Sequence, residues 1–418
     1  VVGMDTRISC SMLEAALVSG ICSMGAEAVS LGTLPTPAVA YLTRKYSADA
    51  GVVISASHNP FEYNGIKFFN NKGYKLADEV EEKIEAIILD NSEELPMPEG
   101  NKVGFRSEIK DAGRDYIDFL KSTIKLDLKG IKIALDCANG AASELAPILF
   151  SELGADICVI NNQPDGININ CNCGSTHMEG LQKFVLEYSA DVGVAFDGDA
   201  DRMLAVDEKG KLIDGDIIMS IIGLAMKKEN NLKRNSIVVT VMSNLGMDIM
   251  AGENGINLVK TKVGDRYVLE AMLEKGCILG GEQSGHVIFL EHNTTGDGML
   301  TALKLLESLK SSGKHLSELA SVMKVYPQVI KNAKVKNENK EKYMNDELIA
   351  CKCRELEEEF HGEGRVLIRP SGTEPLIRVM IEGQDANYIA ERASELARLI
   401  EERWEERRVG KECRSRWS

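Results

Sequence analysis

The stretch GVVISASHNPFEYNGIKFF, residues 51–69, decides the fold class. It begins with an apolar run typical of a buried strand, and the hydroxyl, imidazole and amide groups of residues 57–59 follow directly. Pro60 then fixes the backbone. Chains of the α/β class present their chemistry in this way, because ligands bind beyond the carboxyl ends of the strands. The stretch therefore predicts a strand followed by a functional loop.

Strand-like and helical patterns alternate along most of the chain. The apolar runs IKIALDC (131–137) and SIVVTV (236–241) precede helical patterns at residues 142–155 and 245–254. This rhythm predicts sheets covered by helices on both faces, so the fold class is α/β. Linker segments rich in proline or charged residues divide the chain into four parts. The last part is smaller, and its pattern predicts the order helix, strand, loop, strand, helix. The linker segments are residues 91–104, 227–235 and 325–329.

The totals of the chain describe an acidic globular protein. At 418 residues it is too long for one ordinary core. The formal net charge of -15 argues against a nucleic-acid or acidic-membrane partner, because phosphate backbones require a basic face. No apolar run approaches the ~20 residues that span a bilayer, and no leader precedes a cleavage site. We expect a soluble, cytoplasmic protein with reduced thiols, since the Cys-x-Cys pairs at 171–173 and 351–353 match no zinc spacing.

Three alternating carboxylates, Asp197, Asp199 and Asp201, lie in the stretch DGDADR. In a loop, such carboxylates converge on one hard cation such as Mg²⁺. An EF-hand is the rival interpretation, since Glu208 falls at loop position twelve from Asp197. That rival fails because position six is Arg202 instead of Gly, and because the flanks read as strands. A solvated acidic turn stays open, but we favour a divalent-metal site.

A second cluster lies in LIRPSGTEPLIRVM, residues 367–380, where hydroxyl, backbone N–H and guanidinium groups can meet one phosphate. Its members are Arg369, Ser371, Gly372, Thr373 and Arg378. In an acidic chain this is the best local phosphate clamp. A basic β-turn, in which Pro370 and Gly372 serve only the turn, is the alternative.

A third stretch, GGEQSGHVIF at residues 280–289, places Glu282, Ser284 and His286 at alternate positions. If the segment is extended, the three side chains face the same side. Such a row of donors and acceptors suits sugar hydroxyls. A strand edge with polar side chains is the alternative, and the motif taken alone favours it.

The role of Ser57 has two interpretations. A Ser-His hydrolase pair is disfavoured, because His58 points to the opposite face of an extended chain and no G-x-S-x-G elbow is present. The other interpretation is that Ser57 carries a phosphoryl group. A serine oxygen near a metal held by carboxylates, with Lys67 and Arg7 to neutralise charge, fits phosphoryl transfer.

The motifs SASHNP, DGDADR, GEQSGH and RPSGTEP, in this order and at these separations, resemble those of the α-D-phosphohexomutase family. The sequence around SASHNP, together with CGSTH at 173–177, is most similar to that of the bacterial members of the family. These members interconvert glucosamine 6-phosphate and glucosamine 1-phosphate for peptidoglycan precursors. The resemblance implies four domains: three α/β domains with mixed sheets covered by helices, and a smaller C-terminal α+β domain. We predict domains at residues 1–118, 119–218, 219–328 and 329–404, with a non-native basic tail at 405–418.

The resemblance also implies the roles of individual residues. Ser57 would be the phosphoserine, and it would share one Mg²⁺ per chain with Asp197, Asp199 and Asp201. Glu282 and Ser284 would hold sugar hydroxyls. Residues implied to hold the non-reacting phosphate are Arg369, Ser371, Gly372, Thr373 and Arg378. Residues implied to line the transfer site, with Lys67 or a histidine as the proton carrier, are Arg7, His58, Lys67, Arg202 and His286.

The same resemblance implies a small sugar phosphate as substrate, glucosamine or glucose 1,6-bisphosphate as activator, and a possible homodimer. Two departures from the family pattern affect the first domain. The family begins with a further strand and helix, so we expect this domain to be incomplete, with an unpaired sheet edge. Cys10 and Ser11 also replace the family's small residue and Asp. The alternative functions are the same chemistry on mannose or glucose phosphates, and a non-catalytic sugar-phosphate binder left by truncation.

Overall fold

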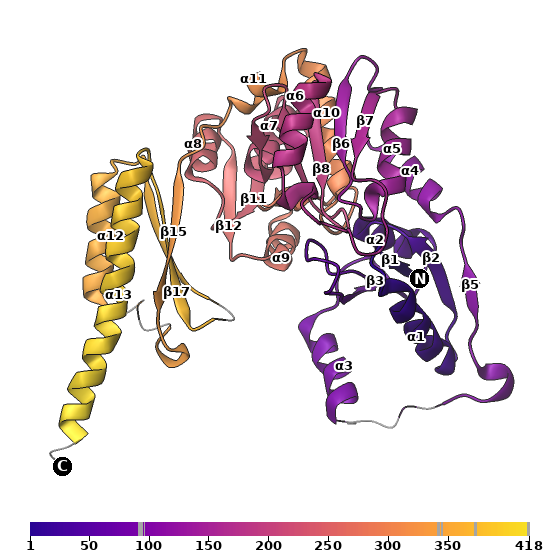
Figure 1. The fold of residues 1–418 in the computed structure, drawn as a ribbon, viewed down its shortest axis with the longest axis horizontal. Coiled ribbons are helices and arrows are strands. Elements are labelled where there is room, and N and C mark those ends of the chain that lie inside the picture. Colours follow the sequence, from indigo (N-terminus) through magenta and orange to yellow (C-terminus); the bar gives the residue numbers. More distant parts are fainter. Residues whose placement is uncertain (91–94, 96, 341–342, 344–345, 372–373, 416–418) are drawn as a thin grey trace. The chain divides into compact units, whose positions relative to one another are not determined.

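The computed structural model describes residues 1–90, 95, 97–340, 343, 346–371 and 374–415 (Figure 1). Contacts within the chain divide it into two compact units. Unit 1 comprises Val1–Ser243 and Ala251–Val322, and unit 2 comprises Asn244–Met250 and Met323–Ser418. Among the described residues, no helix combines the length and the apolar character that a membrane span requires.

The first sheet of unit 1 has the strand order β4-β3-β1-β2-β5, with β4 antiparallel to its neighbour and the other strands parallel. Its strands are β1 (Val2–Met4), β2 (Ala28–Thr33), β3 (Ala50–Ile54), β4 (Ile66–Asn70) and β5 (Arg106–Glu108). Helices α1 (Cys10–Ser23), α2 (Thr36–Lys45) and α3 (Asp78–Asp90) belong to the same part of the chain. The polar loop that follows GVVIS begins where β3 ends, as the sequence predicts.

The second sheet has the order β10-β9-β8-β6-β7, in which β6, β7 and β8 are parallel. Its strands are β6 (Lys132–Asp136), β7 (Asp156–Ile160), β8 (Val192–Phe196), β9 (Met203–Asp207) and β10 (Leu212–Ile213). Its helices are α4 (Ala112–Ser122), α5 (Ala142–Glu152) and α6 (Glu179–Tyr188). Every residue of β8 and β9 is buried, so the DGDADR loop that joins these antiparallel strands starts from a rigid base.

The third sheet has the order β12-β11-β13-β14, with only β14 antiparallel. Its strands are β11 (Ser236–Thr240), β12 (Asn257–Thr261), β13 (Leu279–Gly281) and β14 (Val287–Phe289). The accompanying helices are α7 (Gly215–Lys228), α8 (Leu245–Glu253), α9 (Asp265–Lys275), α10 (Gly298–Ser312) and α11 (Leu316–Ala320). Short 3-10 helices lie at Gly100–Lys102, Gly174–Thr176, Lys233–Asn235 and Asn337–Asn339.

Unit 2 contains an antiparallel sheet of order β15-β17-β16, on which two helices pack (Figure 1). Its elements are β15 (Gln328–Lys334), α12 (Glu347–Glu359), β16 (Arg365–Pro370), β17 (Leu376–Glu382) and α13 (Ala386–Ser415). The core between sheet and helices is aliphatic, with Ile377, Val379 and Ile381 of β17 completely buried.

Two features of unit 2 differ from the sequence reading. Strand β15 was not predicted, because its alternation is weak: Ala333 is buried, but Ile330 is 45% exposed and the strand carries two lysines. Helix α13 continues to Ser415, through most of the segment predicted to be an aperiodic tail. The α/β class is confirmed, and the strands form four separate sheets in chain order, as a four-part architecture requires. The exact domain boundaries stay a prediction.

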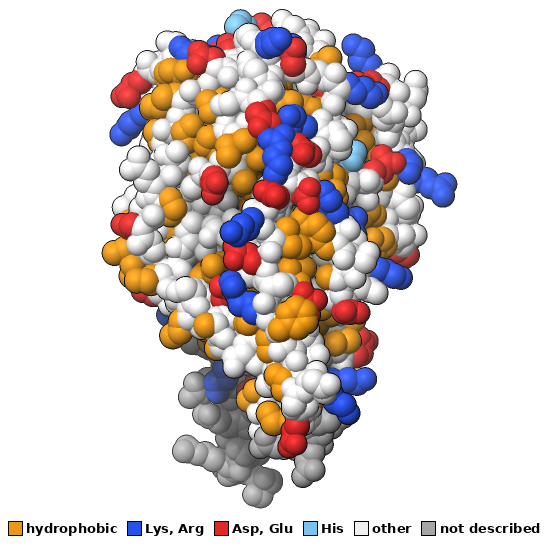
Figure 2. All heavy atoms as spheres, turned by 90° about the vertical axis from the view of Figure 1, so that its right-hand side faces the viewer, with side chains coloured by type: hydrophobic (Ala, Val, Ile, Leu, Met, Phe, Trp, Pro, Cys, Tyr) orange, Lys and Arg blue, Asp and Glu red, His pale blue; other side chains and the backbone are white. Residues whose placement is uncertain are grey.

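The outer face of helices α4 and α5 carries both signs of charge. Arg114 donates hydrogen bonds to Asp118 and Glu152, and Lys121 donates to Glu152 at 2.8 Å. Figure 2, which views the side of the molecule that bears these helices, shows acidic and basic side chains interspersed instead of gathered by sign. On this face the two signs cancel over short distances, so it carries no extended field of one sign.

Candidate active site

Three loops of unit 1 meet at one place, although they follow strands of three different sheets. The loop after β3 carries Ser57, the loop after β8 carries the three aspartates, and the loop after β13 carries His286. The Ser57 hydroxyl donates to Asp197 Oδ2 at 2.7 Å, and His286 Nδ1 lies 3.6 Å from Asp201 Oδ2. Residues more than 80 positions apart in the sequence are thus brought into direct contact.

The aspartate cluster fits a metal ion. Asp197, Asp199 and Asp201 are all buried, and one oxygen atom of each lies within 4.8 Å of the others. Asp199 Oδ1 and Asp201 Oδ1 are inaccessible to solvent and accept no hydrogen bond from the described residues. A buried carboxylate oxygen without a partner is costly, and a bound cation would compensate that cost. The sequence prediction that the three carboxylates converge is therefore confirmed.

The aspartate loop is tight because a second loop packs against its backbone. A Cβ atom added at Gly140 would lie 2.3 Å from the carbonyl oxygen of Gly198, which separates the first two aspartates. The N–H of Ala141 donates to the same Gly198 oxygen at 2.8 Å. Ala200 has a φ of +53°, in the left-handed region. These contacts hold the loop in its conformation, although the three carboxylates within it repel one another.

Burial and neighbouring charges of both signs shift the pKa values within the cluster. Burial and the carboxylates of Asp201 and Asp199 raise the pKa of Asp197 well above its ordinary value. Burial alone would raise the pKa of Asp201, but Lys67 and His286 hold this pKa well below the ordinary value of an aspartate. Burial alone would lower the pKa of Lys67, but Asp199 and Asp201 outweigh it and raise this pKa. Lys67 Nζ lies 2.6 Å from Asp199 Oδ2, so the cluster already holds one cation of its own.

The Ser57 loop is strained and is held from several directions. Ser57 has a φ of +52°, a conformation that costs free energy for a residue other than glycine. Its own N–H donates to the hydroxyl of Ser55 at 2.9 Å, and that hydroxyl donates to Asp5 Oδ2 at 2.6 Å. Asn170, from the second sheet's part of the chain, donates to the carbonyl oxygens of Ser57 and Asn59 at 2.9 and 3.0 Å.

Arg7 holds the backbone of this loop in place. Its side chain is buried, and Nε donates to Asp5 Oδ2 at 2.9 Å. Its other donors bind carbonyl oxygens of the loop, those of Ser57, Asn59, Pro60 and Tyr63. A guanidinium group has five N–H bonds, and these five contacts use all of them. The geometry therefore favours a structural role for Arg7, in place of the charge-neutralising role that the sequence suggested.

His58 and Arg202 form a pair at the rim of the site. Arg202 NH1 lies 3.0 Å from His58 Nδ1, and since an arginine only donates, Nδ1 accepts. Burial and the positive charge of Arg202 lower the pKa of His58, so the imidazole is neutral near pH 7. Its Nε2 then carries the proton. The structure thus brings together Ser57, His58, Lys67 and Arg202 around the aspartates.

The GEQSGH segment is a turn, so the condition under which its three polar side chains would share one face is not met. Residues 282–286 connect the antiparallel strands β13 and β14, and Gly285 has a φ of +91°. A Cβ atom at Gly285 would lie 2.2 Å from the carbonyl oxygen of Met203, which explains why glycine is needed. Consequently the three side chains do not face one side: Ser284 is exposed, whereas His286 is 2% exposed. Glu282 is partly exposed, and its Oε1 accepts from the N–H of Gly264 at 3.1 Å.

The predicted phosphate clamp lies in unit 2, on β16 and β17. Arg369 and Arg378 are directly opposite each other in the antiparallel ladder, so their side chains lie on the same face. Burial and the charge of Arg378 lower the pKa of Arg369. Like charges placed opposite each other are unfavourable, and a bound anion would relieve the repulsion. Ser371 is buried beside them, with its carbonyl oxygen bound by Lys340 Nζ at 2.7 Å. Gly372 and Thr373 lie outside the described residues.

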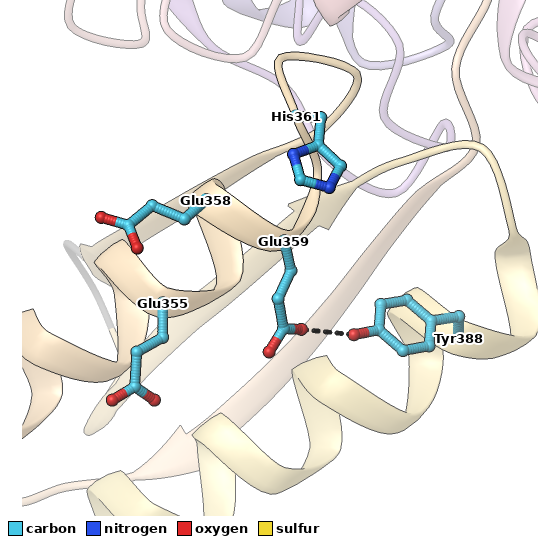
Figure 3. Close-up of a pocket in the computed structure, with 5 residues that line it drawn as sticks. All are labelled: Glu355, Glu358, Glu359, His361 and Tyr388. Atoms are coloured by element: carbon cyan, nitrogen blue, oxygen red, sulfur yellow. Dashed lines mark hydrogen bonds between the residues drawn. The ribbon is translucent and has the colours of Figure 1, made fainter.

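Unit 2 also contains an open pocket that has none of the predicted residues. Figure 3 shows its lining: Glu355, Glu358, Glu359, His361 and Tyr388. The Tyr388 hydroxyl donates to Glu359 Oε2 at 2.5 Å. Three carboxylates repel a phosphate, so this pocket does not suit a phosphorylated ligand.

The chain matches known proteins over most of its length. It matches the four family models of phosphoglucomutase/phosphomannomutase: α/β/α domain I at residues 1–95, domain II at 114–210, domain III at 214–326 and the C-terminal domain at 330–399. A phosphoglucosamine mutase of Acetivibrio thermocellus is 69% identical over 402 residues, which are 96% of this chain and 90% of the relative. One of Clostridium acetobutylicum is 62% identical with the same coverage of both chains.

Solved structures agree with this match. A phosphoglucomutase/phosphomannomutase family protein from Burkholderia thailandensis has a TM-score of 0.76 at 25% identity, covering 95% of this chain and 87% of its own. The Aspergillus fumigatus N-acetylphosphoglucosamine mutase, solved with GlcNAc-6P and magnesium, has a TM-score of 0.69 at 18% identity, covering 94% of each chain. The second likeness is one of fold.

Proposed function

The chain belongs to the phosphoglucomutase/phosphomannomutase family, and we propose that it interconverts glucosamine 6-phosphate and glucosamine 1-phosphate. The observation that carries the chemistry is the hydrogen bond between Ser57 Oγ and Asp197 Oδ2, which places a serine oxygen at a cluster of buried carboxylates. The close relatives that act on phosphoglucosamine support the choice of sugar.

The reaction consists of two phosphoryl transfers. In the first, the bond between the Ser57 oxygen and phosphorus breaks, and a bond forms between phosphorus and the free hydroxyl of the sugar phosphate, which loses its proton. The product is a 1,6-bisphosphate. After the sugar reverses its orientation, its other phosphoryl group moves to Ser57, and a proton returns to the sugar oxygen. The enzyme thus ends in the state in which it began.

The proton is carried by Lys67 or His58. Both side chains line the cluster: Lys67 donates to Asp199, and His58 Nδ1 accepts from Arg202. To take the proton of the sugar hydroxyl, Lys67 must first become the neutral amine, or Arg202 must release the lone pair of His58 Nδ1; the same group then returns the proton in the second transfer. His286, the third candidate, is less suited because both of its nitrogen atoms are engaged. Its Nε2 accepts from the N–H of Gly296 at 3.0 Å, and its Nδ1 faces Asp201.

Mg²⁺ is the proposed metal, one per chain. Asp197, Asp199, Asp201 and the Ser57 oxygen would hold it, since an all-oxygen donor set suits a hard cation. Once bound, it would supply positive charge that stabilises the transferring phosphoryl group. Lys67 and Arg202 add fixed positive charge from the protein itself.

Recognition of the substrate is assigned to the other predicted residues. Arg369, Ser371 and Arg378, together with Gly372 and Thr373, would bind the phosphate that is not reacting, because guanidinium groups and hydroxyls match phosphate oxygens. Glu282 and Ser284 would bind sugar hydroxyls. A glucosamine or glucose 1,6-bisphosphate would activate enzyme that lacks the serine phosphate. The domain boundaries, a homodimer and a cytoplasmic location stay predictions.

Intact-mass measurement with peptide mapping tests the proposal. After incubation with glucose 1,6-bisphosphate, the protein should gain one phosphoryl group on the peptide that contains Ser57. The Ser57→Ala variant should gain none and lose nearly all mutase activity, while Ser19→Ala, a control on the exposed side of α1, should behave as the wild type. A phosphate on another residue, or an active Ser57→Ala variant, would overturn the mechanism.

Coupled assays with three 6-phosphosugars test the substrate. Glucosamine 6-phosphate should turn over faster than mannose 6-phosphate or glucose 6-phosphate. Equal or slower turnover would show that the sugar assignment is wrong and would favour the mannose or glucose alternatives. Inactivity toward all three, with sugar-phosphate binding retained, would favour the non-catalytic binder.

A further inference from the structure

Thr36 contacts the aspartate loop twice, although 163 positions separate it from Asp199. It is the first residue of α2, beside the first sheet, and it is completely buried. Its N–H donates to the carbonyl oxygen of Asp199 at 2.9 Å, and its hydroxyl donates to Asp199 Oδ2 at 2.6 Å. One residue therefore holds both the backbone and the side chain of a proposed metal ligand.

These contacts make the two oxygens of Asp199 unequal. Oδ2 accepts from Thr36 and also from Lys67 Nζ at 2.6 Å. Oδ1 is buried and accepts no hydrogen bond from the described residues. Two donors on one oxygen withdraw its electron density and block its approach to a further partner. Oδ1 is thus the oxygen that remains available to a cation.

We propose that Thr36 is a positioning residue for the metal, which it serves by fixing Asp199 as a ligand through Oδ1 alone. This inference rests on the metal site of the proposed function. Thr36 itself donates its proton to the carboxylate, so it acts through Asp199. Side chains that orient metal ligands in this way typically change metal affinity by about 10- to 100-fold when they are removed.

The proposal has a consequence for the choice of metal. Mg²⁺ and Mn²⁺ suit six oxygen ligands that each give one atom, whereas Ca²⁺ takes six to eight oxygens and often uses both atoms of a carboxylate. While Thr36 and Lys67 together occupy Oδ2, Asp199 cannot offer both oxygens; without the Thr36 hydroxyl, one lone pair of Oδ2 becomes available beside Lys67. Removal of the hydroxyl should therefore weaken Mg²⁺ and Mn²⁺ binding more than Ca²⁺ binding.

The local sequence explains why Thr36 is placed so firmly. Pro35 precedes it with a φ of -54°, and Pro37 follows it in the first turn of α2. The N–H groups of a first helical turn have no partner within the helix, so the Thr36 N–H is free to bind Asp199. That backbone bond does not depend on the side chain. A valine at position 36 therefore keeps one of the two contacts and the volume of the residue.

Direct measurement of Mn²⁺ binding tests the inference without reference to activity. Metal-free protein is titrated with Mn²⁺ while the free ion is followed by electron paramagnetic resonance, and Mg²⁺ and Ca²⁺ are then added as competitors. Thr36→Val should bind Mn²⁺ about 10- to 100-fold more weakly and discriminate less between Mg²⁺ and Ca²⁺. Thr36→Ser, which keeps the hydroxyl, should stay near the wild type.

Thr43→Val is the matched control. Thr43 lies on the same helix and is equally buried, but its hydroxyl donates to the carbonyl oxygen of Val39 at 2.7 Å. It should leave Mn²⁺ affinity unchanged. Wild-type affinity in folded Thr36→Val, or an equal loss in Thr36→Ser, would overturn the inference. Failure of the wild type to bind Mn²⁺ at all would overturn the metal site itself, and the role of Thr36 with it.

Discussion

Arg7 and Asn170 donate hydrogen bonds to the same two carbonyl oxygens, those of Ser57 and Asn59. Arg7 follows a strand of the first sheet, and Asn170 precedes β8 of the second. The strained backbone at Ser57 is therefore held by two parts of the chain that fold on separate sheets. This arrangement keeps the serine oxygen beside Asp197 without a contact to the hydroxyl from either donor.

Arg7→Lys should damage catalysis even though it keeps the charge. A lysine has three donors on one atom and cannot span four loop carbonyls and Asp5, so the loop should shift. Displacement of a reacting group by about 1 Å costs on the order of 100-fold in rate. Steady-state assays should show that loss in kcat, while Arg106→Lys, at an exposed arginine, stays at the wild-type rate. Full activity of Arg7→Lys would show that the charge of Arg7 matters and its hydrogen bonds to the loop do not.

Asn170→Ala removes the second donor to the same carbonyls. Because Arg7 remains on both carbonyls, the expected loss is smaller. The folding free energy should fall by about 1–3 kcal/mol, since two partly buried carbonyls each lose one hydrogen bond worth about 0.5–1.5 kcal/mol, and kcat should fall measurably. Chemical denaturation and kinetics measure the two effects. Asn172→Ala is the matched control, because Asn172 is exposed and its φ of +52° is close to the +58° of Asn170. It should lose only the stability that alanine costs in the left-handed region and leave kcat unchanged. A larger fall in kcat for Asn170→Ala than for Arg7→Lys would contradict this prediction.

Gly140→Ala should disturb the aspartate loop through backbone contact. The new methyl group would lie 2.3 Å from the Gly198 oxygen, and overpacking of this kind costs about 1–3 kcal/mol. Both stability and Mg²⁺-dependent activity should fall. Gly180→Ala is the matched control, since nothing lies within 4 Å of its Cβ position on α6. There alanine should stabilise the helix by about 0.5–1 kcal/mol. The idea fails if the two variants behave alike.

Asp199→Asn should lower activity by orders of magnitude while the fold survives. The amide keeps the size of the side chain but loses the charge that attracts the cation. Mg²⁺ titration of the rate should move to higher concentration, and circular dichroism should be unchanged. Asp156→Asn, at an exposed aspartate of β7, serves as the control. Turnover preserved at limiting Mg²⁺ would remove Asp199 from the metal site.

Asp297 should make stability depend on pH. Its carboxyl is completely buried, and burial raises its pKa, although Tyr116 and Asn293 donate to it. A carboxyl whose pKa is higher in the folded state binds protons more readily there, so its contribution weakens as pH rises from about 3.8 toward the folded value.

The Asp297→Asn variant removes this titration. It should therefore gain melting temperature relative to the wild type as pH increases from about 4 to about 7. The new amide faces the amide of Asn293, which costs stability equally at every pH, so the slope is the readout. Parallel melting profiles for the two proteins would rule out the effect.

The sequence predicted well those features that depend on short-range pattern. The apolar runs of β3 and β8 mark strands, and the polar loops that follow them carry Ser57 and the aspartates. Alternating carboxylates in a loop can converge on one cation, and here the three aspartates do lie together.

Features that depend on distant partners were missed. Thr36 and Asn170 contact the site across 163 and 113 positions, and nothing in their neighbourhoods distinguishes them from helix-start or turn residues. Arg7 was assigned a charge role because the carbonyls that use its donors lie about fifty residues away. The turn at Gly285 could not be told from an extended segment in the sequence, since three polar residues at alternate positions occur equally in turns.

Unit 2 is assembled from two separate stretches of chain, and the first is the start of α8. Asn244 and Tyr326 exchange two hydrogen bonds, and the buried Glu382 carboxylate accepts from the N–H of Leu245 at 3.1 Å. A proteolytic nick after Val322 would therefore not release the last hundred or so residues as a free fragment. The two pieces should still migrate together in size-exclusion chromatography under native conditions and separate only in denaturant. The C-terminal part of this enzyme is therefore held by an earlier segment of the chain as well as by the peptide link that precedes it.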